Sequence, residues 1–310
     1  MLSQKQPTST FNLPVGSRLV GKWGKQPYLI KKKLGQGAIG VVYLVEKLDG
    51  QLVALKMSDQ IASLTSEINV LKKLAKVQGM SPGPSLFEID DWISPRGDQY
   101  PFYTMEYVEG ERLESFLRKR GVGWLGVFFS QLLLELDQLH EAGFVLGDLK
   151  LDNVIVTKNP TRLRFIDVGG VTQFGRSVKE YTEFYDRGYW RLGDRQADPK
   201  YDLFSLGMMA INYAYPKQFS RTNDPKRELF HRLKEADILK DYHHIIKRAL
   251  KGSYQSCQEL RTDLHRNHLS RLTKNKSYRD VSSPYHEQSW IELVLFTIIS
   301  FISIAFTLFM

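Results

Sequence analysis

The sequence contains a single cysteine, Cys257, so no disulfide can form within the chain. This usage fits a reducing compartment and excludes a small secreted domain held together by disulfides. The first 27 residues contain no continuous apolar run, so no signal peptide is expected there. No segment recurs at a period of about 20 to 50 residues, which argues against a repeat architecture.

What the chain does contain is the composition of a basic globular protein. Its 310 residues allow one domain plus a short appendage, and 42% hydrophobic residues with 12% aromatics can build a sizeable core. Disorder throughout the chain is therefore excluded. The 43 Lys and Arg residues exceed the 34 Asp and Glu residues, giving a net charge of +9. This balance favours polyanionic partners such as ATP, nucleic acid or anionic lipid.

A polar segment, residues 146–153, lies between two apolar, strand-like runs. It carries a carboxylate, a cation and an amide on Asp148, Lys150 and Asn153, and Asp167 follows a third such run. Phosphoryl transfer needs groups of this kind to position the reactants and neutralise charge. Because Asp and Asn are also ordinary turn residues, the segment by itself leaves a simple polar turn open.

A glycine-rich pattern, Gly-x-Gly-x-x-Gly, lies upstream between two strand patterns. It is made by Gly35, Gln36, Gly37 and Gly40. The same spacing opens dinucleotide-binding folds, but there a helix follows the glycines. Here β-branched and aromatic residues follow at 41–45, and then a hairpin signal at 48–50. This order favours a flap over phosphates.

The next strand pattern ends in Lys56, within Val53-Ala54-Leu55-Lys56, where protein kinases have Val-Ala-Ile-Lys. Apolar residues at helical spacing then predict a helix over residues 61–77. Glu67 lies on this helix and is the candidate partner of Lys56. Two further helices are expected over residues 111–120 and 124–141.

Taken together, these elements resemble a Hanks-type (eukaryotic-like) protein kinase over residues 28 to 264. More narrowly, the chain is similar to the YabT-type membrane-anchored serine/threonine kinases of spore-forming bacteria. That similarity rests on Gly147-Asp148-Leu149-Lys150, on Ile166-Asp167-Val168-Gly169-Gly170, on the segment 181–190 and on an apolar C-terminus. It implies an α+β, bilobal protein-kinase-like fold, with a small antiparallel-sheet lobe that carries one helix and a large helical lobe.

The resemblance implies four parts in the chain. We expect an N-terminal lead-in over 1–27, a kinase domain over 28–268 (small lobe 28–106, large lobe 107–268), a basic juxtamembrane tether over 269–289 and a transmembrane helix over 290–310. The implied cofactors are ATP and Mg²⁺ (or Mn²⁺), and the implied partners are protein substrates.

The resemblance also assigns roles to the polar residues. Asp148 would receive the proton of the substrate hydroxyl, and Lys150 would steady the γ-phosphate and favour Ser/Thr over Tyr substrates. Asn153 and Asp167 would hold the metal, because oxygen ligands suit a hard cation. Thr182, in the substrate-binding segment, would approach Asp148 and Lys150.

For the nucleotide, the resemblance implies a pocket at the junction of the lobes. Lys56, held by Glu67, would contact the phosphates, and Met105 stands at the gatekeeper position. The backbone carbonyl of Glu106 and the amide of Val108 would face the adenine edge. The apolar walls would come from Val42, Ala54 and Ile155.

Three departures from the family pattern carry information. Leu146-Gly147 stands where His-Arg is common, so a phosphorylated activation segment would find no arginine receiver. Tyr189 and Ser253 stand where the family has a Glu and its Arg partner, so both halves of one salt bridge are absent. Eleven positions separate Lys56 from Glu67, fewer than is usual in the family.

The C-terminal segment 293–310 has eighteen residues without charge, Pro or Gly. As a helix it would be about 27 Å long at ~1.5 Å per residue, close to the ~30 Å hydrocarbon core of a bilayer. Cations dominate the preceding tether, so the positive-inside rule predicts a single-pass anchor in the cell membrane with the kinase domain cytoplasmic. An anionic membrane surface is then an expected partner.

Two further functional hypotheses, and two alternatives to a protein kinase, arise from the sequence. Sequence-independent DNA binding through the basic large lobe and tether would substitute for the missing phosphorylation switch. Self-association would allow autophosphorylation. Against a protein kinase stand two alternatives, a small-molecule kinase of the aminoglycoside type and a catalytically dead scaffold.

Overall fold

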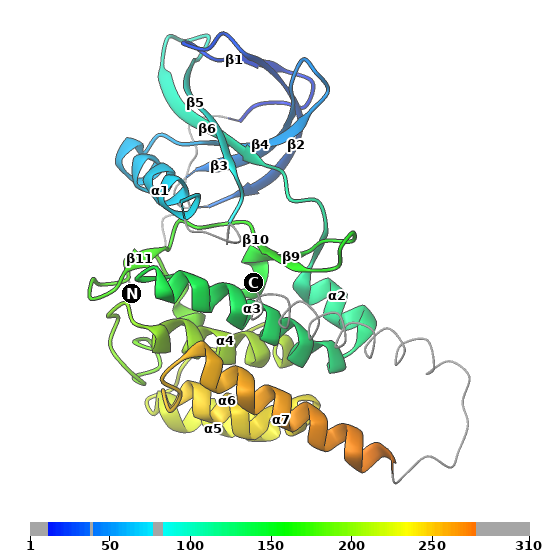
Figure 1. Ribbon diagram of the computed structural model, residues 1–310. Helices are drawn as coiled ribbons and strands as arrows, with labels where there is room; N and C mark the ends of the chain where they lie inside the picture. Colours follow the sequence, from blue (N-terminus) through cyan, green and yellow to red (C-terminus); the bar gives the residue numbers. More distant parts are fainter. Residues whose placement is uncertain (1–11, 38–39, 77–82, 277–310) are drawn as a thin grey trace.

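The computed structural model describes residues 12–37, 40–76 and 83–276, with side chains as far as residue 268. Figure 1 shows two lobes, with a strongly curled sheet and helix α1 above a larger lobe of helices. The chain passes from the upper lobe to the lower one after strand β6. The predicted α+β, bilobal kinase-like fold is confirmed.

The small lobe is built on an antiparallel sheet whose strand order is β1-β2-β3-β4-β6-β5. Its strands are β1 (Arg18–Val20), β2 (Pro27–Gln36), β3 (Val41–Glu46), β4 (Leu52–Met57), β5 (Leu86–Ile93) and β6 (Gln99–Glu106). Alternate residues of β3 (Val41, Tyr43 and Val45) are buried, as expected for a strand with one face on a core. Strand β1 lies inside the predicted lead-in 1–27, so part of that segment belongs to the sheet.

Helix α1 (Ile61–Leu74) follows β4 and packs on the other face of the sheet. Its buried residues Leu64, Ile68, Leu71 and Leu74 recur at three- and four-residue steps, which gives the helix one apolar side. The helix begins at the predicted residue. It ends at Leu74, earlier than predicted, because Ala75 and Lys76 form a turn, and the last predicted residue, Val77, lies outside the described residues.

The large lobe consists mainly of helices with short strands at its upper edge. Its helices are α2 (Leu113–Arg120), α3 (Gly123–Glu141), α4 (Pro199–Ala214), α5 (Pro225–Glu235), α6 (His243–Leu250) and α7 (Cys257–Lys276), with 3₁₀ turns η1 (Leu151–Asn153), η2 (Glu183–Tyr185) and η3 (Asp237–Tyr242). Its strands are β7 (Glu111–Arg112), β8 (Phe144–Val145), β9 (Val154–Val156), β10 (Leu163–Phe165) and β11 (Thr172–Gln173).

One predicted helix starts later than expected. Residues 111–120 were predicted to be helical, but Glu111 and Arg112 pair with Val156 and Ile155 as strand β7, and α2 begins only at Leu113. The pairing extends the small β10-β9-β7 sheet beneath the cleft. Helical periodicity could not reveal this, because a two-residue strand has no period of its own.

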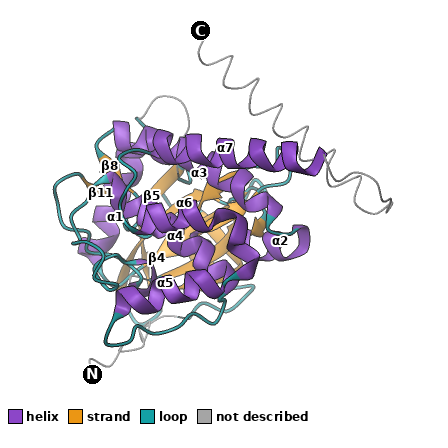
Figure 2. Ribbon diagram, turned by 90° about the horizontal axis from the view of Figure 1, so that it is seen from below, coloured by secondary structure: helices purple, strands orange, loops and turns teal. Residues whose placement is uncertain are grey.

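Helix α4 lies in the middle of the large lobe, as the view from below in Figure 2 shows. Asp198 caps its N-terminus by accepting a hydrogen bond from the amide of Tyr201, and Pro199 occupies the first turn. Almost every residue of the helix is buried, including the carboxylate of Asp202. A buried charge in such a helix requires several hydrogen-bond donors nearby.

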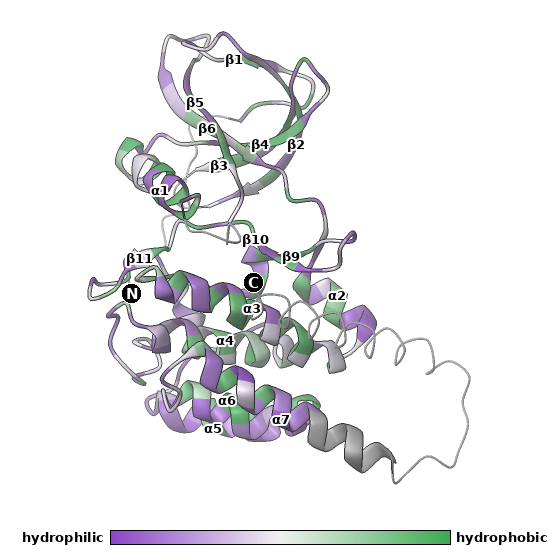
Figure 3. Cartoon of the chain, viewed as in Figure 1, coloured by the Kyte–Doolittle hydropathy of each residue, from purple (hydrophilic) through white to green (hydrophobic). Residues whose placement is uncertain are grey.

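Helix α7 packs along α3 and continues to Lys276, beyond the predicted domain boundary at residue 268. Cys257, at its start, is buried, and its Sγ lies 3.4 Å from His140 Nδ1. In Figure 3 the helices of this lobe carry hydrophobic and hydrophilic residues side by side. Among the described residues no helix is long and apolar enough to cross a membrane. The predicted transmembrane helix at 290–310 lies outside them.

One buried carboxylate in α3 gives the fold a dependence on pH. Burial raises the pKa of Glu135 to about 8, only partly offset by Arg164 and Arg162, and its Oε2 has no hydrogen-bond partner. The folded state therefore favours the protonated form. That contribution to stability is complete below the unfolded pKa near 4.5 and is lost as the pH rises towards 8.

We therefore expect Glu135→Gln to stabilise the protein at alkaline pH. The gain in free energy of unfolding should be a few kcal/mol, about 1.4 kcal/mol for each pKa unit, near pH 8.5, and should shrink towards zero near pH 4.5. Thermal unfolding across this range measures it. Glu141→Gln, at an exposed site on the same helix, is the matched control. A difference that does not change with pH would contradict the assignment.

Candidate active site

Gly35 and Gln36 of the glycine-rich pattern end strand β2, and Gly37 and Gly40 lie between β2 and β3. Gly37 donates its amide to the carbonyl of Gly40 at 2.9 Å, and the chain continues as strand β3 instead of a helix. A Cβ on Gly40 would overlap the carbonyl oxygen of Met57, so this close approach of two strands requires glycine. The arrangement is the predicted flap and not a dinucleotide-binding turn.

Lys56 lies on β4 beneath this flap and joins three elements. Its Nζ lies 2.5 Å from Glu67 Oε1 on α1 and 3.9 Å from Asp167 Oδ1, which follows β10 of the large lobe. The predicted pair is thus present despite the short spacing in sequence. The ammonium of Lys56 therefore lies between the carboxylate of Glu67 on α1 and the carboxylate of Asp167 after β10.

The charges of this group depend on one another. Burial would lower the pKa of Lys56, but the carboxylates of Asp167 and Glu67 outweigh burial and hold it above its usual value. Burial would likewise raise the pKa of Asp167, but Lys56, the amide of Gly169 and Lys150 hold it below its usual value. Both groups are therefore charged at neutral pH, as a phosphate-binding cation and a metal-binding carboxylate must be.

Two residues near Lys56 were not predicted. Tyr103 on β6 is the cross-strand partner of Lys56, and burial together with the negative charges of Glu67 and Asp167 raises the pKa of its hydroxyl. Glu180 brings a further carboxylate next to Gly169. A Cβ placed on Gly169 would lie 3.0 Å from Glu180 Oε2 and 3.3 Å from Asp167 Oδ1. Burial, together with Glu67 and Asp167, raises the pKa of Glu180 to about 7. Strand alternation could have indicated Tyr103, whereas nothing in the sequence indicated Glu180.

The catalytic-loop residues meet around one hydroxyl. Lys150 Nζ lies 2.5 Å from Asp148 Oδ2 and donates to Thr182 Oγ1 at 3.0 Å. Thr182 in turn donates its hydroxyl and its amide to Asp148 Oδ1, at 2.9 and 3.0 Å. A substrate hydroxyl in the place of Thr182 Oγ1 would lie between a carboxylate that can accept its proton and an ammonium.

The donor set fits a divalent metal ion. Asn153 is buried and donates its Nδ2 to the carbonyl of Asp148 at 3.1 Å, so its side-chain oxygen is the atom that can face a cation. The side chain of Asp167 is 42% exposed, and its lowered pKa keeps it negatively charged. One amide oxygen and one carboxylate, with phosphate oxygens and water, suit the octahedral shell of Mg²⁺.

A buried carboxylate from α4 fixes the start of this loop. Asp202 accepts hydrogen bonds from the amides of Leu146 (2.8 Å) and Gly147 (3.0 Å) and contacts His140 Nε2 at 2.9 Å. Gly147 has φ = +81°, and a Cβ there would overlap the carbonyl oxygen of Gly170. The position that is often arginine in the family therefore accepts only glycine here.

Some of the residues predicted for the adenine pocket lie in one apolar cluster. Ala54 and Met105 are buried in one apolar cluster and Val42 packs against it, whereas Ile155 and Val108 are half-buried and not members of this cluster in the described structure. The remaining predicted residues, Gly35, Gln36 and Gly37, lie at the flap, and Glu106 ends β6.

The side chain of Glu106 has a role that the sequence did not indicate. It forms a two-pronged ion pair with Arg164 of β10, at 3.0 and 2.8 Å, and Arg164 also donates to the carbonyl of Gly83. Arg164 lies three residues before Asp167. The pair therefore joins the end of β6, where the chain leaves the small lobe, to strand β10, which ends two residues before Asp167.

This fold and this site define a phosphotransferase of the protein kinase type. A family model, the protein kinase domain, matches residues 28–282. The chain belongs to the protein kinase family. Membership implies ATP and a divalent metal ion as cofactors.

Individual relatives narrow the comparison. The chain is 45% identical over 265 residues to the serine/threonine-protein kinase YabT of Bacillus subtilis (strain 168), covering 85% of this chain and 78% of that protein. It is 32% identical over 149 residues to the serine/threonine-protein kinase cek1 of Schizosaccharomyces pombe, covering 46% of this chain and 11% of that one. The solved structure of vaccinia related kinase 3 is similar in fold, with a TM-score of 0.59, 18% identity and coverage of 86% and 95% of the two chains. The predictions of a Hanks-type, YabT-like chain and of a serine/threonine protein kinase are confirmed.

The crowding at Gly147 gives a direct test of the catalytic loop. Gly147 and Gly143 both have φ = +81°, but a Cβ on Gly143 would meet no atom within 4 Å. We expect Gly147→Ala to lower kcat on the order of 10²-fold, because displacing the loop by about 1 Å misplaces Asp148. Gly143→Ala pays only the backbone strain, about 1–2 kcal/mol in stability, and should keep kcat nearly unchanged. Equal losses of kcat in both variants would show that crowding at Gly147 is unimportant.

Proposed function

We propose that this chain is a membrane-anchored serine/threonine protein kinase that works without phosphorylation of its activation segment. It transfers the γ-phosphate of ATP to protein Ser/Thr hydroxyls. The observation that carries the proposal is the contact of Thr182 with both Asp148 and Lys150. A protein segment there lines the catalytic carboxylate, as a site for a polypeptide substrate requires.

In this proposal each cluster of the site has one task. Lys56, oriented by Glu67, binds the phosphates, while Asn153 and Asp167 hold Mg²⁺, which neutralises phosphate charge when bound. Asp148 accepts the proton of the substrate hydroxyl. Lys150 stabilises the charge on the transferred group.

Two substitutions in separate clusters test the activity. With full-length protein, labelled ATP, Mg²⁺ and a generic substrate such as myelin basic protein, Asp148→Asn should lower the rate about 10²- to 10⁴-fold. Lys56→Met should remove most activity by weakening phosphate binding. Lys31→Met removes an exposed lysine that pairs with Glu46 and should have no effect. Transfer to aminoglycosides but not to protein, or no transfer by the parent chain, would overturn the proposal in favour of a small-molecule kinase or a scaffold.

The absence of a phosphorylation switch is supported by what surrounds Gly147. A side chain there would meet the carbonyl of Gly170 and the Cγ1 of Val178, the latter at 3.3 Å from a built Cβ. Val178 is buried, with 1% of its surface exposed. The part of the activation segment that faces Gly147 is therefore apolar, and Gly147 offers no cation to a phosphate.

The membrane anchor rests on the sequence. The uncharged segment 293–310 and the cations of 269–289 support a single-pass helix with the kinase on the cytoplasmic side. Fractionation of cells tests this, since the full chain should need detergent for extraction and a chain ending at residue 289 should not. Extraction of the full chain by salt alone would exclude the anchor.

Activation by DNA remains the hypothesis for how the kinase activity is controlled. Its candidate contacts are cations exposed on the large lobe. Arg248 is paired with Asp263 and Glu259, and Arg232 with Glu228. The exposed cations of this region include Lys226, Arg227, Lys234, Lys247 and Lys251. Phosphate contacts need exposed cations of this kind.

A charge-removal series tests the hypothesis. Neutralising Lys226, Arg227 and Lys247 to Gln should reduce any stimulation of kinase activity by DNA at low salt and lower the salt dependence by about one unit for each lost phosphate contact. The same change at Lys31, Lys32 and Lys33, exposed residues of the small lobe, is the control. If DNA leaves the activity of the parent protein unchanged, the hypothesis fails.

A further inference from the structure

The substrate-binding segment, residues 177–190, runs from beneath the catalytic loop to the start of the turn before α4. Its catalytic contact is Thr182, which bonds to Asp148 and Lys150. At its beginning Val178 is buried with Val145, Ala197 and Tyr201, while Thr182 itself is only partly buried. Burial of Val178 therefore fixes the segment four residues before Thr182 but leaves the orientation of Thr182 to other contacts.

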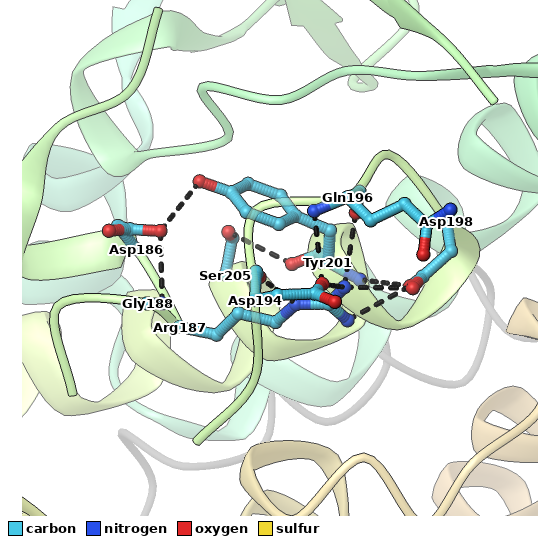
Figure 4. Close-up of polar contacts among 8 residues, drawn as sticks. All are labelled: Asp186, Arg187, Gly188, Asp194, Gln196, Asp198, Tyr201 and Ser205. Carbon is cyan, nitrogen blue, oxygen red and sulfur yellow. Dashed lines mark hydrogen bonds and ion pairs between the residues drawn. The ribbon is translucent and has the colours of Figure 1, made fainter. Parts of the chain in front are cut away.

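A buried carboxylate anchors the other end of the segment. Asp186 is completely buried and accepts hydrogen bonds from the amides of Gly188 (3.1 Å) and Tyr189 (2.8 Å) and from the hydroxyl of Tyr201 (3.0 Å). Arg195 adds an ion pair, with Nε at 2.8 Å and Nη2 at 2.7 Å from Asp186 Oδ2. Figure 4 shows this carboxylate turned towards Tyr201. Without these donors a buried carboxylate would be strongly destabilising.

The neighbouring residue fixes the following turn separately. Arg187 pairs with Asp198, the residue that caps α4, at 2.9 and 2.8 Å, and it donates to the carbonyls of Asp194 and Gln196 (Figure 4). These contacts hold the loop 187–198 against α4. They do not reach back towards Thr182, so they cannot by themselves orient it.

Arg195, in contrast, contacts the residue that precedes Thr182. Its guanidinium carbon lies 4.3 Å from the ring centroid of Tyr181, the residue immediately before Thr182. The same planar group therefore joins Asp186, four residues after Thr182, to Tyr181, one residue before it. A lysine could pair with Asp186 but could not make the flat stacking contact at the same time.

We infer that Arg195 is a positioning residue for phosphoryl transfer, which holds Tyr181, and through it Thr182, against Asp148 and Lys150 without a phosphate. The inference rests on the proposed function and identifies what takes the place of its absent switch. A purely structural role for Arg195 would need only the ion pair with Asp186. A positioning role needs the stack on Tyr181 as well.

Three substitutions separate these roles in the full-length protein. Arg195→Lys keeps the charge and loses the stack, Tyr181→Leu loses the ring and leaves the ion pair, and Tyr181→Phe keeps the ring. We expect the first two to lower kcat for protein phosphorylation about five- to tenfold, the worth of a partly desolvated cation–π contact, with KM for ATP unchanged. Tyr181→Phe should stay within about twofold of the parent. Arg176→Ala, an exposed arginine of the same loop, is the control.

A second readout separates failure of this inference from failure of the proposed function. The amide of Thr182 donates to Asp148 Oδ1 at 3.0 Å, so its hydrogen exchange reports the position of the segment whether or not the chain is active. Exchange at Thr182 should be faster in Arg195→Lys and Tyr181→Leu and unchanged in Tyr181→Phe. Parental exchange at Thr182 in both of the first two variants overturns the inference, and so does parental kcat in both. An inactive parent chain would overturn the proposed function. Hydrogen exchange at Thr182 would then be the measurement that tests whether Arg195 positions the segment.

Discussion

The buried ion pair between Lys56 and Glu67 is the contact on which the rest of the site depends. It joins the sheet of the small lobe to helix α1, and its 3.9 Å approach to Asp167 reaches across to the large lobe. Lys56 is 7% exposed and Glu67 3%, so removing either residue would leave the other buried without its nearest counter-charge. The cleft thus has a fixed cation on its upper side, and the position of α1 determines where that cation lies.

The residues of the site in the large lobe are held in place by a different interaction. Asp202, buried in α4, turns two backbone amides of the catalytic loop towards itself, and the loop then presents Asp148, Lys150 and Asn153 upwards. The small sheet of β7, β9 and β10 carries the chain to Asp167. Because the supporting residues lie on helices and strands, the reacting groups are held by rigid elements instead of by loops alone.

Much of the fold and of the site could be predicted from the sequence, because these parts depend on the order of neighbouring elements along the chain. The strand–glycines–strand pattern distinguished a flap from a dinucleotide-binding turn, and helical spacing located α1 with Glu67 on it. The contacts that were missed join positions far apart in sequence: Glu106 with Arg164, and Arg195 with both Asp186 and Tyr181. No periodicity reports such pairs. The two-residue strand β7 was missed because its pairing with β9 overrides a helical pattern.

The central claim is that Lys56, Asn153 and Asp167 bind one metal-bound nucleotide in the cleft, and calorimetric titration with ATP tests it most directly. The account predicts that Mg²⁺ tightens ATP binding to the parent protein and that Asp167→Asn removes most of this effect while leaving metal-free binding largely intact. It also predicts that Lys56→Met weakens binding with and without Mg²⁺. If ATP bound equally well with and without Mg²⁺, and Asp167→Asn changed neither affinity, the account would be contradicted.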